Sequence, residues 1–156
     1  MKSKLKIYID TSVLNFYFAD EEPKGKRTTR EFLKGVRAGK YDTFISVVVI
    51  RELDETGEPK RTKLLGLVEK YQLKILHMTP ECENLADRYV KDGIIPLRYR
   101  DDAVHIAVAV INGVELLVSW NLKHMVKLKT INSVNAISRE LGYKLIDIIT
   151  PEEALP

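Results

Sequence analysis

The chain has 156 residues, which is enough for one domain with a sizeable core and too few for two comfortable ones. It is 45% hydrophobic and 30% charged with a net charge of +3, as in many globular proteins, and no apolar run approaches the roughly 20 residues of a membrane-spanning helix. Its only cysteine, Cys82, excludes an internal disulfide framework, and without a signal-peptide pattern at the start we expect a cytoplasmic location.

The first predicted element is a strand within the stretch LKIYIDTS, residues 5–12. Apolar residues alternate there with a lysine and a tyrosine, and Asp10 follows at once. Ligands bind just outside the carboxyl ends of strands in an open parallel sheet, so a central position for this strand would place Asp10 in a site. Asp10, Thr11 or Ser12 is equally suited to cap the helix that follows.

A short helix is predicted at residues 13–19, and after a loop a longer helix is predicted at residues 27–40. Phe32, Leu33 and Val36 form the expected buried stripe of the longer helix. Its opposite face is either a ridge that contacts phosphates or an ordinary solvated face, and it carries four basic residues spaced three and four apart: Arg27, Arg30, Lys34 and Arg37.

Residues 42–49 begin as a strand and then become a helix that should reach about residue 55, with Ser46 as its N-cap. Glu52 lies on the same side of this helix as Val48 and Val49. A partly buried carboxylate is costly unless it is paired, hydrogen-bonded or bound to a metal. Glu52 is therefore either a functional carboxylate or an edge residue whose carboxylate reaches solvent.

The most apolar helix is predicted at residues 101–112, and because apolar residues surround it almost completely it should be buried centrally. Asp101 and Asp102 open this helix; one can serve as its cap, but two exceed what capping requires. The remaining helices are predicted at 62–71, 80–91 and 131–141, and the remaining strands at 73–77, 114–119 and 145–149.

Strands and helices alternate along the whole chain, without internal repeats. This alternation predicts an α/β fold in three α/β/α layers, with a mainly parallel sheet of four to five strands between helices. We expect residues 1–156 to form a single domain. Acidic and polar residues that follow separate strands, or begin the helix before one, could then converge at one end of the sheet: Asp10, Glu52, Asp101, Asp102, Ser119 and Asn121.

Several carboxylates brought together repel one another, so such a site makes physical sense mainly around a hard divalent cation. Oxygen ligands and retained waters suit Mg²⁺ or Mn²⁺. A cation held in this way beside water is equipped for phosphodiester hydrolysis. The histidines show no paired zinc-ligand spacing. His105 is either a support for a carboxylate or a core residue, and His124 is either a phosphate contact or a surface residue.

Four segments resemble motifs of the PIN-domain nucleases, especially the single-domain toxin ribonucleases of the VapC type. IYIDTSVL resembles the opening strand with the first metal-binding aspartate, at Asp10, and ISVVVIREL resembles the serine-to-glutamate segment, with the glutamate at Glu52. DDAVHIAVAV resembles the Asp-Ala-x-x-x-Ala helix, which implies Asp102 as the third carboxylate and Asp101 as the cap. LLVSWNLKHM resembles the last motif, but Asn121 stands where the family commonly has aspartate.

The resemblance implies a PIN-like fold and a Mg²⁺- or Mn²⁺-dependent endoribonuclease in which Asp10, Glu52 and Asp102 hold the metal while Ser119 and Asn121 assist. Because asparagine brings no charge, we expect one firmly held ion, with any second ion arriving with the RNA phosphate. The resemblance also implies a toxin, a small antitoxin partner and a homodimer. The basic residues that are candidates for contacting RNA are Arg30, Lys34, Arg100 and Lys123.

The main alternative is a PIN-like fold that has lost its chemistry and binds RNA or a protein. Asn121 favours this alternative, whereas the three acids argue against it, since a binding module has no physical need to gather them. An aspartyl phosphatase is disfavoured because Asp-x-Asp is absent after the first strand, and a nucleotide-binding fold is disfavoured because neither glycine-rich phosphate motif occurs.

Overall fold

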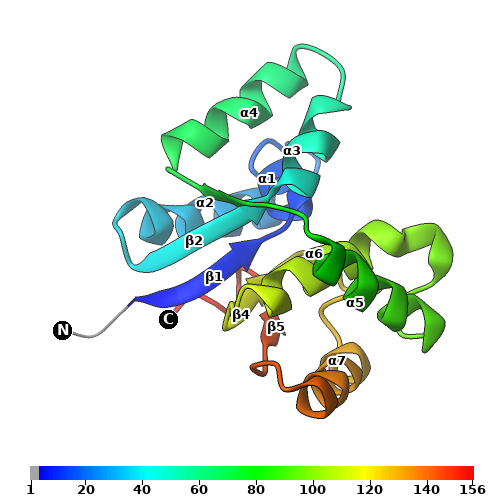
Figure 1. Ribbon diagram of the computed structural model, residues 1–156. Coiled ribbons are helices and arrows are strands. Elements are labelled where there is room, and N and C mark those ends of the chain that lie inside the picture. Colours follow the sequence, from blue (N-terminus) through cyan, green and yellow to red (C-terminus); the bar gives the residue numbers. More distant parts are fainter. Residues whose placement is uncertain (1–3) are drawn as a thin grey trace.

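A computed structural model describes residues 4–156, in which five parallel strands form one sheet (Figure 1). The strand order is β3-β2-β1-β4-β5, so β1 is central. The predicted α/β fold with a parallel sheet of four to five strands is confirmed. The strands are β1 Leu5–Ile9, β2 Tyr41–Ser46, β3 Lys74–Leu76, β4 Leu116–Val118 and β5 Asp147–Ile149.

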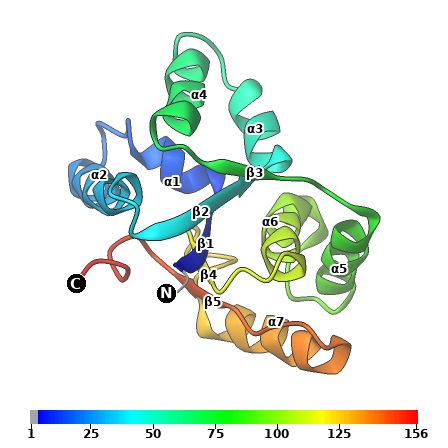
Figure 2. The same ribbon diagram turned by 60° about the vertical axis from the view of Figure 1, so that its left-hand side comes forward.

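Within the described residues, seven α-helices connect these strands and cover the sheet. They are α1 Thr11–Phe16, α2 Pro23–Arg37, α3 Val47–Asp54, α4 Lys60–Lys70, α5 Pro80–Lys91, α6 Arg100–Ile111 and α7 Leu128–Leu141. Figure 2 shows α2 on one side of the sheet and α5, α6 and α7 on the other, with α3 and α4 beyond the edge formed by β3. No helix between residues 4 and 156 is long and apolar enough to cross a membrane.

The predicted element boundaries differ from the observed ones by a few residues. Helix α2 starts at Pro23, inside the predicted loop, because the fixed φ of proline suits the first helical turn. It ends at Arg37, and Gly39 then adopts the left-handed φ of +80° that redirects the chain into β2. Helix α7 starts at Leu128, three residues before its predicted start, and β4 and β5 have only three residues each.

Helix α6 is the buried central helix that its composition predicts. All eight residues from Ala103 to Val110 are buried, and α6 packs against α5 on one side and the sheet on the other. The prediction that Asp101 caps this helix is wrong. The helix begins one residue earlier, at Arg100. The Asp101 carboxylate instead forms an ion pair with the Arg51 guanidinium, with Oδ2 and Nη2 2.9 Å apart.

The turn between β2 and α3 forms as predicted. The Ser46 side chain accepts a hydrogen bond from the Val48 backbone N–H at 3.2 Å, which satisfies one of the free donors at the start of α3. The predicted stripe of α2, formed by Phe32, Leu33 and Val36, is buried. These contacts fix both helices relative to the sheet and thereby the residues that leave its carboxyl end.

Helix α7 is tied to the segment before β5 by one side chain. Asn135 donates from Nδ2 to the Ile146 carbonyl at 2.9 Å and accepts on Oδ1 from the Ile146 N–H at 3.0 Å. This pair of bonds takes the place of backbone partners that Ile146, just outside the strand, would otherwise require.

We expect Asn135→Ala to lower the free energy of unfolding by about 1–3 kcal/mol, because both backbone groups of the buried Ile146 lose their partner. Urea denaturation followed by circular dichroism measures this change. The matched control is Asn132→Ala on the same helix, where the side chain is exposed and little change is expected. Equal effects of the two substitutions would contradict the role assigned to Asn135.

Candidate functional site

Polar residues leave the carboxyl ends of three neighbouring strands at one end of the sheet. Asp10 follows β1, Ser46 ends β2, and Ser119 follows β4. The register pairs Ile9 with Val118, which brings Asp10 and Ser119 side by side. Asp10 and Ser119 were predicted to lie near each other at this end of the sheet, whereas Ser46 was predicted only as a helix cap.

Asp10 is almost completely buried, with 4% of its surface exposed. Its Oδ1 accepts a hydrogen bond from Ser12 Oγ at 2.5 Å, and its Oδ2 accepts one from Ser119 Oγ at 2.6 Å. Burial raises the pKa of Asp10 above its ordinary value, although the charge of His105 and the two serine hydroxyls oppose this shift. Asp10 occupies the N-cap position of α1, yet its side chain makes no capping hydrogen bond. Asp10 is therefore the N-cap residue of α1 by position, but its carboxylate is held mainly by Ser12 and Ser119.

Glu52 on α3 points into the same region, with 29% of its side chain exposed. Its Oε1 accepts hydrogen bonds from Thr11 Oγ1 at 2.9 Å and from His105 Nε2 at 2.6 Å. Burial alone would raise the pKa of Glu52, but the bond and charge of His105 and the bond from Thr11 lower it below its ordinary value. Glu52 is thus held as a carboxylate by groups from α1 and α6 and does not simply extend into solvent.

His105 links Glu52 to the central strand through a buried hydrogen-bonded chain. Its Nδ1 lies 2.6 Å from Tyr8 Oη, and Tyr8 Oη lies 2.8 Å from Ser46 Oγ. Burial would lower the pKa of His105, but its bond to Glu52 and the negative charges of Glu52, Asp10 and Asp102 raise it. A protonated ring donates to both Glu52 and Tyr8, which in turn donates to Ser46. His105 is therefore both a core residue and a support for a carboxylate.

Asp102, in the first turn of α6, is held by the segment after β4. Its Oδ2 lies 3.0 Å from Nδ1 of His124, whose ring packs on Tyr99 with the centroids 4.3 Å apart. His124 is thus only partly exposed, with 11% of its side chain accessible, and it is paired with Asp102 instead of lying free at the surface. Asn121 Oδ1 accepts from the His124 N–H at 3.0 Å, so the amide of Asn121 shapes the turn that presents this histidine.

The three carboxylates surround His105 electrostatically but do not form a ready metal site. Glu52, Asp10 and Asp102 all raise the pKa of His105. From residue 4 to residue 156, however, no group of three or more histidine, cysteine, aspartate or glutamate side chains is gathered closely enough to hold a metal ion. Each carboxylate has its own hydrogen-bond partners instead. Two serines bind Asp10, a threonine and an imidazole bind Glu52, and a second imidazole binds Asp102.

Among the candidate RNA contacts, Lys123 lies next to this region, with its Nζ 5.7 Å from the centre of the Tyr99 ring. The other three basic residues interact with neighbouring groups: Arg30 Nε with Tyr17 O at 2.9 Å, Lys34 Nζ with Glu31 Oε2 at 3.2 Å, and Arg100 Nη2 with Asp87 Oδ1 at 2.9 Å.

Sequence reasoning missed Tyr8 and assigned Ser46 only a capping role. Tyr8 stands at the polar position of an alternating pattern, but a central strand of a parallel sheet is covered on both faces, and Tyr8 is fully buried. The feature of the sequence that could have revealed this role is the hydroxyl of Tyr8 inside a central strand, since a buried hydroxyl requires a hydrogen-bond partner. Its partner, His105, is 97 residues away in the sequence.

The chain matches no protein-family model and no curated protein. Chains from two crystal structures share its fold. One is VapBC2 from Rickettsia felis bound to a DNA fragment from the promoter, with 13% identity, a TM-score of 0.57, and coverage of 94% of this chain and 98% of that chain. The other is DNA-bound VapBC from Salmonella typhimurium, with 16% identity and the same TM-score and coverage. The predicted PIN-like fold is confirmed.

We expect Tyr8→Phe to lower the free energy of unfolding by about 1–3 kcal/mol, because the hydroxyls of Tyr8 and Ser46 and the ring of His105 form one buried chain. Thermal and urea denaturation measure this change. Tyr89→Phe is the matched control, since Tyr89 is equally buried but its hydroxyl has no hydrogen-bond partner among the described residues. The control should be neutral or stabilising, and a larger loss in the control than in Tyr8→Phe would contradict the structure.

Proposed function

We propose that this protein is a Mg²⁺- or Mn²⁺-dependent endoribonuclease of the VapC type, with residues 1–156 as one domain. The observation that carries the proposal is the environment of Asp10. Its carboxylate is buried at the carboxyl end of the central strand, where ligands bind in open α/β sheets, and burial raises its pKa. In the part of the chain that the structure describes, only neutral groups donate hydrogen bonds to it. A bound cation would offset this cost of burying a charge.

The donor chemistry fits a hard divalent ion. Asp10, Glu52 and Asp102 offer only carboxylate oxygens, which Mg²⁺ and Mn²⁺ prefer. To hold one ion together, these side chains would have to turn partly away from their present partners. When bound, the ion would supply polarisation of the scissile phosphate and acidification of a water molecule. Since Asn121 is uncharged and its Oδ1 is engaged in a turn, three carboxylates favour one firmly held ion.

The residues around the carboxylates orient them for this role. Ser12 and Ser119 hold both oxygens of Asp10, and Ser119 Oγ itself accepts from the Asn121 N–H at 2.9 Å. Thr11 and His105 hold one oxygen of Glu52. Each oxygen of Asp10 accepts one of these bonds and keeps a lone pair for a ligand, whereas Glu52 Oε1 accepts two bonds and leaves Oε2 as the oxygen for a ligand.

RNA would approach past Lys123, which is the best placed of the four candidates because it lies beside Tyr99 and the ring of His124 at this end of the sheet. The side chains of Arg30, Lys34 and Arg100 already bind neighbouring groups. These three residues would therefore contribute to the long-range attraction of RNA and not to direct contacts with it. Attraction to the phosphate backbone should weaken as the salt concentration rises.

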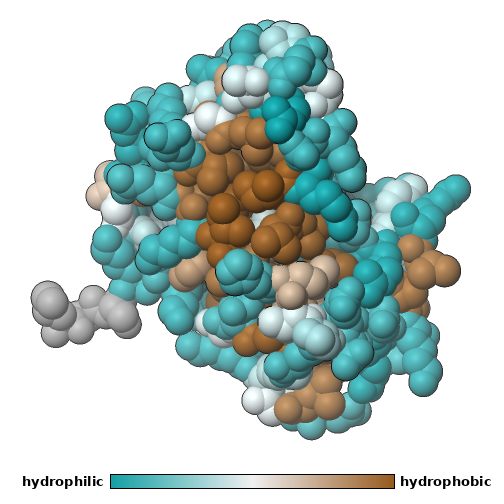
Figure 3. All heavy atoms as spheres, turned by 45° about the horizontal axis from the view of Figure 1, so that its top comes forward, coloured by the Kyte–Doolittle hydropathy of each residue, from teal (hydrophilic) through white to brown (hydrophobic). Residues whose placement is uncertain are grey.

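We further propose that the protein is a cytoplasmic toxin that forms a homodimer and is neutralised by a small antitoxin. The similarity in fold to chains of two VapBC complexes supports this assignment. Figure 3 shows a broad hydrophobic area on one face, bordered by hydrophilic residues. Large exposed apolar areas of this kind mark contact sites for other proteins.

We expect Asp10→Asn to abolish RNA cleavage while the fold remains intact. The substitution removes a buried charge, so the free energy of unfolding should stay equal or increase. Cleavage of a mixed RNA pool in Mg²⁺ or Mn²⁺, with circular dichroism of the same preparation, measures both properties. RNA cleavage by a pure preparation of the Asp10→Asn variant would contradict the proposed role of Asp10. Cleavage by neither protein would favour the binding-module alternative.

Calorimetry with Mg²⁺ and Mn²⁺ should show binding near one equivalent in the unmodified protein and at least about tenfold weaker binding in Asp102→Ala, which removes one of three charged ligands. Asp101→Ala is the matched control, because Asp101 is adjacent in sequence but exposed and paired with Arg51. This control should bind the ion nearly as well as the unmodified protein. Equal losses in both variants would indicate a general charge effect instead of a metal site at Asp102.

A further inference from the structure

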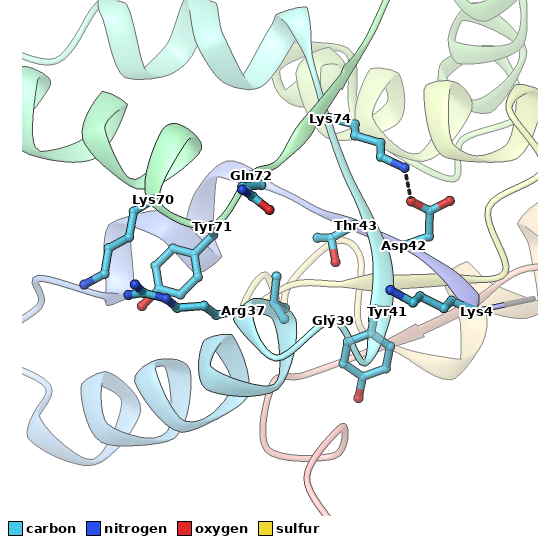
Figure 4. Close-up of a pocket in the computed structure, with 11 residues that line it drawn as sticks. Lys4, Arg37, Gly39, Tyr41, Asp42, Thr43, Lys70, Tyr71, Gln72 and Lys74 are labelled. Carbon is cyan, nitrogen blue, oxygen red and sulfur yellow. Dashed lines mark hydrogen bonds and ion pairs between the residues drawn. The ribbon is translucent and has the colours of Figure 1, made fainter.

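A cavity of about 360 Å³ lies at the opposite end of the sheet from the carboxylates. It is bounded by the amino ends of β1, β2 and β3 and by the carboxyl-terminal ends of α2 and α4 (Figure 4). Neither the proposed cleavage reaction nor the proposed metal uses any residue of this cavity. Six of its lining residues carry the inference: Lys4, Arg37, Thr43, Lys70, Tyr71 and Lys74.

Four basic side chains from separate segments line this cavity, with Asp42 as the one acidic residue among them. Lys74 neutralises Asp42 through an ion pair of 2.5 Å. Lys70 donates to Tyr17 Oη at 3.1 Å. Lys4 and Arg37 have no hydrogen bond or ion pair to any residue in the range 4–156, and Lys70 forms no ion pair there, so three positive charges in the cavity lack a counter-charge.

A buried polar group in the wall also lacks a partner. Thr43 is 6% exposed, and its Oγ1 makes no hydrogen bond within the described residues. An unpaired buried hydroxyl is unfavourable, and a ligand that hydrogen-bonds to it would remove that cost. Gly39 forms another part of the wall, and a Cβ at Gly39 would lie 3.3 Å from Lys4 Nζ. The missing side chain leaves room for the lysine amine beside the cavity.

Helix dipoles explain only part of this charge. Arg37 and Lys70 lie in the last turns of α2 and α4, where positive charge favours the helix end. That effect does not account for Lys4, which precedes a strand, or for the unpaired hydroxyl of Thr43.

We propose that this cavity binds the phosphate group of a ligand of mononucleotide size. A phosphate monoester carries nearly two negative charges at neutral pH, and the uncompensated cations of the cavity would attract it. Lysine and arginine together suit phosphate, because one offers a compact charge and the other a planar set of donors. The volume lies within the usual range for small-molecule sites, so there is room for the remainder of the ligand.

The test is a titration of the full chain, without divalent metal and at low ionic strength, followed by ¹H–¹⁵N NMR and calorimetry. The ligands are inorganic phosphate, uridine 5′-monophosphate and uridine. We expect saturable binding of the two phosphates, shifts confined to residues of the cavity, and no binding of uridine. Tighter binding of the nucleotide than of inorganic phosphate identifies a nucleotide as the ligand, whereas equal affinities identify free phosphate.

The double variant Lys4→Gln/Arg37→Gln should weaken phosphate binding at least about tenfold, because both free cations are lost. The control pair Arg27→Gln/Lys34→Gln removes the same charge from α2 outside the cavity and should change the affinity less than about twofold. Thr43→Val should leave the unliganded melting temperature unchanged or raised while weakening phosphate binding.

Absence of saturable phosphate binding would overturn the proposal. Equal weakening by the two double variants would overturn it as well, because it would indicate attraction to net charge and not to a built site. Thr43→Val provides a separate test if Lys4→Gln/Arg37→Gln impairs folding. None of these measurements requires RNA cleavage or a metal, so their failure is distinguishable from failure of the proposed nuclease function.

Discussion

The hydrogen bond between His105 and Glu52 is the interaction on which the geometry of the carboxyl end of the sheet depends. His105 is the only strongly polar side chain among the buried residues 103–110 of α6, so its partners must come from the elements packed around that helix. Those partners are Tyr8 on β1 and Glu52 on α3. A satisfied buried network of this kind rigidifies its surroundings and fixes the rotation of α6 about its own axis.

That rotation also determines where Asp102 lies. Asp102 is three residues before His105, on nearly the same side of the helix, and there it meets His124 from the turn after β4. Asp10 is oriented separately, by Ser12 within α1 and Ser119 after β4. Residues from several elements thus hold the three acids in fixed directions.

The sequence predicted the fold because the periodicity of its apolar residues is strong and local. The alternation around Ile7 and Ile9, the all-apolar helix at 101–112 and the cap at Ser46 depend on nearby residues, and the structure contains all three. Side-chain partners across elements were not predictable in this way. Asp101 pairs with Arg51 instead of capping α6, and the ring of His124 packs on Tyr99, because both contacts depend on how distant helices and loops pack. The boundaries of α2 and α7 shifted for a similar reason, since proline and packing decide the first turn.

The hydrogen bond from Ser119 to Asp10 joins residues 109 positions apart in the sequence. Strand β1 is made well before β4, its neighbour in the sheet, and closing such a long loop is entropically slow. During synthesis from the ribosome, the acidic residues of the first half therefore exist without the serine, the imidazoles and Asp102 that complete their surroundings. The full set of side chains at this end of the sheet therefore exists only after His124 has been made, because His124 is the partner of Asp102.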